Sequence, residues 1–221
     1  MGEQTFPAYR PIDLETWPRR QHYPYYKEGL KCGYSITVRA DVTALAAYAR
    51  RSGRRFYGCF LYAAAKAVNG LEAMKMMVTP EGGPGVWETV HPNFTVFHED
   101  DGTFTDLWTE YRPDFDDFYR EWERVRQTYG SVHGVKGRPD QPANFFCVSC
   151  VPWLDFTGFA TQSPGEPAPF PIITYGQYTQ TGDRLTLPVA LTIAHASADG
   201  YHASLFFKSL QEALDDFDTM A

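Results

Sequence analysis

Two segments near the C-terminal end differ sharply in their pattern of hydrophobic and polar positions. Residues 185–193 form a long apolar run, which is typical of a buried β-strand. In residues 201–217 the apolar positions recur at the three- and four-residue spacing of one helix face; these are Leu205, Phe206, Leu210, Leu214 and Phe217. The pattern predicts a strand that passes through a short junction into a helix.

The same reasoning predicts the other elements. Strands are expected over residues 33–39, 86–90, 93–97, 103–109, 144–152 and 172–180, and helices over 44–50, 59–68 and 113–129. Capping residues frame the helices: Asp41 or Thr43 and Pro113 or Asp114 at starts, Gly70 and Gly130 at ends. Turns are expected at 98–102 and 181–183, and irregular segments at 1–12, 131–143 and 163–171.

Strands and helices are mixed along the chain without strict alternation, and no internal repeat or linker divides it. This order favours an α+β fold, a mixed sheet with helices packed on it. The chain has 221 residues, which suffices for one domain with its own core, and we expect a single domain over residues 1–221.

Composition narrows the functional classes. A net charge of -7 argues against general nucleic-acid binding, although the pairs Arg19–Arg20, Arg50–Arg51 and Arg54–Arg55 could still hold an anionic ligand. Aromatic residues make up 16%, which suits an aromatic-lined pocket. No apolar run is long enough to span a bilayer, residues 1–9 lack a signal-peptide core, and the 4 cysteines follow no disulfide-rich pattern. We therefore expect a cytoplasmic protein.

The junction between the last strand and helix carries candidate chemistry in His195, Asp199 and Gly200. Asp199 is also a good helix N-cap, and a lone histidine is often only packed. A metal site of His195, Asp199 and His202 would need one continuous helix, which the strand pattern opposes. The spacing of Cys147 and Cys150 places the two thiols on opposite faces of a strand. The acidic residues of turn 98–102 lack the spacing of a calcium-binding loop. We therefore expect no metal site.

The His-x-x-x-Asp-Gly spacing at this junction resembles the signature of the chloramphenicol acetyltransferases, and the dihydrolipoamide acyltransferases share a related one. Further blocks follow in family order, at 17–23, 32–35, 93–98, 149–153, 171–174, 178 and 182–185. The resemblance implies a two-layer sandwich, a homotrimer with active sites between subunits, and transfer of an acetyl group from acetyl-CoA to a hydroxyl of chloramphenicol, which inactivates the antibiotic.

The resemblance also implies roles for individual residues. His195 is the general base, a task that suits a histidine because its unperturbed pKa of about 6.5 leaves it mostly neutral at pH 7. Ser149 donates to the oxyanion, Thr174 helps to bind the intermediate, and Asp199 pairs with Arg19. Tyr178, Arg55 and Tyr57 contact CoA; the acceptor pocket is lined by Tyr26, Tyr34, Phe104 and Phe159. Without the resemblance, Ser149 is a serine in a half-buried strand, and no Gly-x-Ser-x-Gly elbow marks it as a nucleophile.

Several positions depart from the family pattern. Ala194 stands where the first of two adjacent histidines is usual, Cys147 replaces an Asn, and Asp106 replaces a small residue of the acceptor pocket. The loop 131–143 also matches poorly. These departures leave two alternatives open: the same chemistry on another hydroxylated acceptor, and a non-catalytic relative that only binds a hydrophobic ligand.

Overall fold

A mixed seven-stranded sheet forms the centre of the protein. The computed structural model describes residues 6–161 and 165–220. The strand order is β2-β10-β8-β7-β5-β6, with β9 paired to β10. The strands are β2 (Gly33–Asp41), β5 (His91–His98), β6 (Thr103–Trp108), β7 (Phe145–Val151), β8 (Ile172–Gly176), β9 (Thr179–Thr181) and β10 (Arg184–Ala194). β5, β7 and β8 run parallel to one another, and the other pairings are antiparallel.

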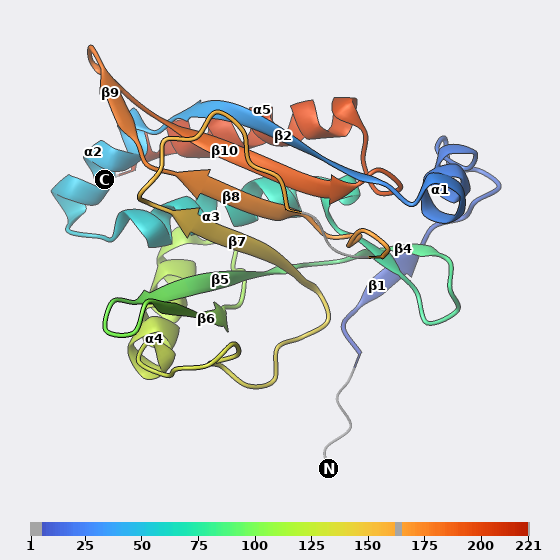
Figure 1. The fold of residues 1–221 in the computed structure, drawn as a ribbon, viewed down its shortest axis with the longest axis horizontal. Coiled ribbons are helices and arrows are strands. Elements are labelled where there is room, and N and C mark those ends of the chain that lie inside the picture. The colour runs from blue at the N-terminus through green and yellow to red at the C-terminus, as the bar shows by residue number, and fades with distance from the viewer. Residues whose placement is uncertain (1–5, 162–164, 221) are drawn as a thin grey trace.

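Four helices cover one face of this sheet (Figure 1). They are α2 (Thr43–Ser52), α3 (Phe56–Asn69), α4 (Phe115–Tyr129) and α5 (Gly200–Asp215). The main core lies between the two layers, and the alternate residues Leu187, Val189, Leu191 and Ile193 of β10 are buried in it. The expected two-layer α+β architecture is thus confirmed.

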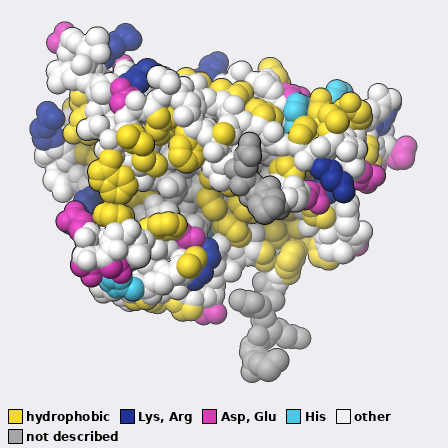
Figure 2. All heavy atoms as spheres, viewed as in Figure 1, with side chains coloured by type: hydrophobic (Ala, Val, Ile, Leu, Met, Phe, Trp, Pro, Cys, Tyr) yellow, Lys and Arg dark blue, Asp and Glu magenta, His cyan; other side chains and the backbone are white. Residues whose placement is uncertain are grey.

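The second face of the sheet carries no helix among the described residues, and it is the face seen in Figures 1 and 2. Hydrophobic side chains gather on it, and several large ones are exposed: Phe97, Phe104, Trp153, Leu154 and Phe159. The segment between β7 and β8 runs across this face in Figure 1, and the Phe159 N–H donates to Thr37 Oγ1 of β2 at 3.2 Å. We call this surface the open face.

A smaller sheet packs beside the end of β10. Its strands are β1 (Tyr9–Pro11), β4 (Pro84–Trp87) and β3 (Met76–Val78), in that order. A short helix α1 (His22–Pro24) and a π-helix η1 (Tyr25–Leu30) stand near it, and Tyr23, Met76, Val86 and Ala196 form a second apolar cluster. The 3₁₀ helices are η2 (Glu72–Met74) and η3 (Asp216–Asp218). This unit was not predicted in full, because its strands are too short for a periodic pattern.

The structure changes four sequence-based expectations. Residues 9–11 of the expected irregular start form β1, while residues 1–5 lie outside the described residues. The strand expected at 86–90 is β4, which ends at Trp87. The strand expected at 172–180 is divided into β8 and β9, because β9 pairs with β10 alone. The helix expected over 113–129 begins at Phe115. Of the two expected starting residues, Asp114 is the N-cap, and its carboxylate accepts from the Asp117 N–H at 2.9 Å.

Candidate active site

The junction between β10 and α5 has the predicted form: the strand ends at Ala194 and the helix begins at Gly200. Asp199 is the N-cap, and its Oδ1 accepts from the backbone N–H of Tyr201 at 3.1 Å and from His202 Nδ1 at 2.8 Å. The His202 backbone N–H also donates to this oxygen, at 3.4 Å. The capping interpretation of Asp199 is therefore confirmed, whatever else this carboxylate does.

Aromatic rings fix the orientation of His195. The Tyr26 ring is stacked on the imidazole with centroids 3.7 Å apart and an interplanar angle of 8°, and the Tyr34 ring meets it edge-on at 5.2 Å. His195 Nδ1 is buried and, among the described residues, has no hydrogen-bond partner. Since Nδ1 is buried, we infer that Nε2 is the ring nitrogen left for contact with a ligand.

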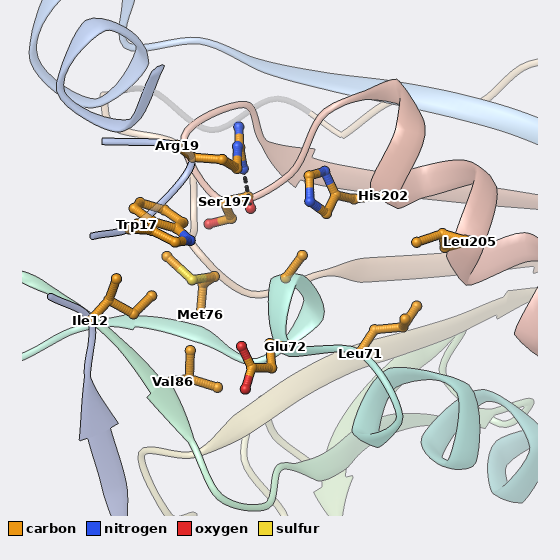
Figure 3. Close-up of a pocket in the computed structure, with 11 residues that line it drawn as sticks. Ile12, Trp17, Arg19, Leu71, Glu72, Met76, Val86, Ser197, His202 and Leu205 are labelled. Carbon is orange, nitrogen blue, oxygen red and sulfur yellow. Dashed lines mark hydrogen bonds between the residues drawn. The ribbon is translucent and has the colours of Figure 1, made fainter. Parts of the chain in front are cut away.

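Arg19 ties the backbone of the junction together. This buried side chain donates from Nη1 to the Ser197 carbonyl at 2.6 Å and from Nη2 to the His195 carbonyl at 2.9 Å (Figure 3). Burial lowers the pKa of Arg19, and the charge of Asp199 opposes that shift. Since its two shortest contacts are carbonyls, Arg19 holds the chain that carries the histidine.

The expected Arg19–Asp199 pair is looser than a hydrogen-bonded pair. Arg19 Nε and Asp199 Oδ2 are 3.8 Å apart, and the Asp199 side chain is 36% exposed. Burial raises the pKa of Asp199, but the hydrogen bonds and charge of His202, and then the charge of Arg19, outweigh it and lower the pKa overall. His202 is thus the closer partner of this carboxylate.

A small cavity of about 180 Å³ lies behind the junction (Figure 3). Arg19, Ser197 and His202 line one side of it. Glu72 and apolar side chains such as Trp17 and Met76 line the rest. Residues of the N-terminal segment and of the junction that carries His195 therefore line the same cavity.

Ser149 and Thr174 lie together in the middle of the sheet. Ser149 of β7 is the register partner of Thr174 on β8, and Thr174 is the partner of Ala190 on β10. Strand alternation directs the Ser149 and Thr174 side chains to the open face, because Val148 and Ile173 are buried in the helix-side core. His195 follows Ala190 by five residues along β10, which is roughly 17 Å at the rise of an extended strand. One chain therefore does not bring the expected base next to the expected oxyanion donor.

A cavity of about 590 Å³ opens beside Cys150, the residue that follows Ser149 on β7. The β5–β7 ladder ends at the pair Phe94–Val148, beyond which the two strands diverge toward their C-terminal ends (Figure 1). Both strands and helices α3 and α4 contribute to the lining, which includes Arg55, Tyr57, Arg126, Pro152 and Trp153. The cavity thus extends from the helix layer to the part of β7 that carries Ser149.

The three expected CoA contacts gather around the start of α3. Arg55 and Tyr57 line the cavity, and the Tyr178 ring, 51% exposed, lies 5.9 Å from the Phe56 ring. The Tyr57 hydroxyl accepts from the Thr95 N–H at 3.2 Å, and burial raises its pKa. Arg126 and Trp153 also line this cavity and were missed, because neither stands out as a cavity residue in the sequence.

The four expected acceptor residues fall into two groups. Tyr26 and Tyr34 lie against His195, as described above. Phe104 is 57% exposed on β6, and Phe159 lies over β2 on the open face. The structure does not gather the four residues into one pocket of a single chain.

The departures Asp106 and Cys147 sit close to each other. Asp106 Oδ2 accepts from Lys136 Nζ at 2.9 Å, and Cys147 is the register partner of Asn93. Burial, and then the charge of Asp106, raises the pKa of the Cys147 thiol to about 11. Ala194 is buried as the last residue of β10. The changed positions therefore affect the region around Ser149 more than the surroundings of His195.

The two metal constellations weighed in the sequence do not form. Helix α5 starts after His195, so His195, Asp199 and His202 do not share a helix face. Cys147 and Cys150 are free thiols on a regular strand. A third group, His98, Asp100 and His133, has candidate ligand atoms within 4.8 Å. Its two imidazoles are stacked 4.1 Å apart at 20°, so their in-plane lone pairs do not converge on one ion.

Comparison with known proteins decides the family. The sequence model described as chloramphenicol acetyltransferase matches residues 7–211. This chain belongs to the chloramphenicol acetyltransferase family. A curated chloramphenicol acetyltransferase of Streptomyces acrimycini is 41% identical over 211 residues, covering 95% of this chain and 96% of that protein. In the part of this family member that the structure describes, no helix is long and apolar enough to cross a membrane.

Solved structures agree on the fold. A chloramphenicol acetyltransferase superposes with a TM-score of 0.83 at 24% identity, over 94% of this chain and all (100%) of that one. The dihydrolipoamide acetyltransferase of Azotobacter vinelandii superposes with a TM-score of 0.61 at 20% identity, over 85% and 83% of the two chains. The α+β sandwich is therefore that of the CoA-dependent acyltransferases.

Proposed function

We propose that this chain acts as a single-domain chloramphenicol O-acetyltransferase that uses acetyl-CoA as co-substrate. The observation that carries the proposal is the setting of His195: its ring is held by Tyr26 and Tyr34 at the end of β10, with Nδ1 buried. A histidine so held suits a general base, which needs a fixed direction of proton transfer. Membership of the family supplies the acyl donor and the acceptor.

In the proposed reaction His195 Nε2 takes the proton of the acceptor hydroxyl as its oxygen attacks the thioester carbonyl. The resulting tetrahedral oxyanion accepts a hydrogen bond from Ser149, with Thr174 beside it in the register. Collapse breaks the carbon–sulfur bond, and the proton passes from the imidazolium to the CoA thiolate. No acyl-enzyme forms, because the two substrates react directly.

The cavity lined by Cys150 and the start of α3 supports the proposed binding of acetyl-CoA. Its volume of about 590 Å³ lies within the usual range of ligand pockets. Arg55 and Tyr57 line it at the start of α3, where backbone N–H groups favour anions such as the CoA phosphates. We propose that acetyl-CoA enters from the helix layer and presents its thioester on the Ser149 side. Because the reaction consumes acetyl-CoA, we also propose that the protein acts in the cytoplasm.

We further propose a homotrimer in which the active site joins two subunits. Along β10 and across to β7, His195 and Ser149 of one chain are separated by roughly 20 Å, whereas one acetyl transfer needs both within a few ångströms of the reacting atoms. The apolar side chains exposed on the open face are typical of an interaction surface. A neighbouring subunit that covers this face would supply the missing partner.

A second candidate keeps the chemistry and changes the acceptor. Asp106 and Lys136 place an ion pair on the face that carries Ser149, which favours an acceptor with polar groups. The remaining alternative is a non-catalytic relative that only binds a hydrophobic ligand. A protein that only binds a ligand would not need the fixed orientation of His195.

Thiol release from acetyl-CoA tests all three candidates. Release that depends on chloramphenicol, and that falls by orders of magnitude in His195→Ala with folding intact, is the expected result. No release from a folded protein that binds CoA would transfer the proposal to another alcohol. No release and no CoA binding would support the binding-only alternative.

A further inference from the structure

A polar network crosses three strands on the open face. Asp106 of β6 is bound to Lys136 Nζ at 2.9 Å, and Lys136 Nζ also donates to Gln141 Oε1 at 3.2 Å. The same Gln141 oxygen accepts from Asn93 Nδ2 of β5 at 2.8 Å, and Asn93 is the partner of Cys147 on β7. The loop 131–143 is thereby fixed to the sheet by the side chains of Asp106 and Asn93, and the departure Cys147 lies next to Asn93 in the register.

The register relates this network to Ser149. Asp106 of β6 pairs with Thr95 of β5. Phe94 of β5 pairs with Val148 of β7, so the next residues on these two strands, Thr95 and Ser149, point to the same face. Asp106 therefore lies on the same face of the sheet as Ser149, two strands away. Two regular strand spacings are about 10 Å, and the divergence of β5 and β7 beyond Phe94–Val148 makes the separation at least that large. That distance is comparable to the length of an acceptor with one aromatic ring.

The Asp106–Lys136 pair has hydrogen-bonding capacity to spare. Only 19% of the Asp106 side chain is exposed, against 54% of the Lys136 side chain. Among described residues, one carboxylate oxygen is engaged by Lys136, and the ammonium group makes two of its three hydrogen bonds. A polar substituent can use the remaining donor and acceptor, whereas a hydrocarbon group would remove water from the pair without replacing it.

We propose that the Asp106–Lys136 pair is the specificity-determining contact for the far end of the acceptor. It favours alcohols that carry a polar, hydrogen-bonding group about 10 Å from the reacting hydroxyl over alcohols that end in hydrocarbon. The inference rests on the proposed function, since it concerns the acceptor side of the same site.

The test compares two acceptors that differ only at the far end: chloramphenicol, whose nitro group is remote from its primary hydroxyl, and the analogue with hydrogen in place of nitro. The variant Asp106→Leu with Lys136→Met replaces the pair by apolar groups of similar size. The ratio of KM values for the two acceptors should shift against chloramphenicol by about 2- to 12-fold, the effect of losing one hydrogen bond. Lys208→Met, in an exposed pair on α5, is the matched control and should leave the ratio unchanged.

The KM for acetyl-CoA and the thermal midpoint establish that each variant is folded. If the double variant does not fold, Lys136→Met alone removes the donor from which the nitro group accepts, and it must shift the ratio in the same direction. Turnover with an unchanged ratio overturns the inference alone. Absence of turnover by the unsubstituted protein overturns the proposed function, and this inference with it.

Discussion

Mixing two inactive variants should restore activity if His195 and Ser149 act across a subunit boundary. His195→Ala removes the proposed base, and Ser149→Ala removes the proposed oxyanion donor. Each variant alone should lose at least 10²-fold in kcat, roughly the cost of removing one oxyanion donor. The two lesions lie roughly 20 Å apart in one chain, so they fall in different active sites when the sites are shared between neighbours.

The size of the recovery follows from counting interfaces. In trimers assembled at random from equal amounts of both variants, half of the chains carry an intact His195 and half carry an intact Ser149. Roughly one quarter of the interfaces then join an intact base to an intact donor, so activity should reach about one quarter of that of the unsubstituted protein. This signal is far above the sum of the separate variants.

The assay is chloramphenicol-dependent thiol release after the two variants are unfolded together in urea and refolded. Refolding the variants separately and mixing them afterwards is the control, because subunits that stay assembled cannot exchange. The oligomeric mass of the refolded mixture is measured in parallel. A co-refolded mixture no more active than the separately refolded one would refute the shared site.

Four further predictions follow from the local geometry. Arg19→Met should destabilise the fold by about 2–4 kcal/mol and lower kcat, because two charged hydrogen bonds to carbonyls are lost. Urea titration measures the change. Arg20 is exposed, and the control Arg20→Met should change the free energy of unfolding by less than about 0.5 kcal/mol. Ser149→Ala should lower kcat by about 10²–10³ with little change in the KM for chloramphenicol; an equal rise in KM would mean a binding role instead. With a pKa of about 11, Cys147 should resist iodoacetamide at pH 8 until urea unfolds the chain, as peptide mass spectrometry would reveal. Burial raises the pKa of Tyr34 to about 12. Its contribution to the free energy of unfolding is therefore complete below pH 10 and is lost between pH 10 and 12. A Tyr34→Phe variant should lose less stability over that pH range.

The sequence was most informative where an element is long and has one clear periodicity. The continuous apolar run at 185–193 became β10, because this strand is paired on both sides and is buried on its helix face and, at Pro188 and Ala190, on its other face as well. The face of α4 was predictable for the same reason, with Phe115, Phe118, Trp122 and Val125 all buried. In both elements burial alone determines the pattern.

Short elements and long-range pairings were beyond the sequence. β1 and β3 have three residues each, and three residues carry no measurable period. The π-helix Tyr25–Leu30, which places Tyr26 on the imidazole, has no compositional signal of its own. The cavity between β5 and β7 depends on where a parallel ladder ends, which is set by packing rather than by any local motif.

For Arg19, the sequence resemblance and the structure indicate different partners. The resemblance indicated a carboxylate partner, but the structure gives it the carbonyls of His195 and Ser197, which lie beyond the regular pairing of β10. Buried carbonyls without donors are costly, and a guanidinium is suited to satisfying two of them from one side. The donor comes from a segment 176 residues away, so the backbone that carries His195 is correctly placed only when the N-terminal segment has docked. Loss of this docking should therefore reduce kcat before it unfolds the sheet.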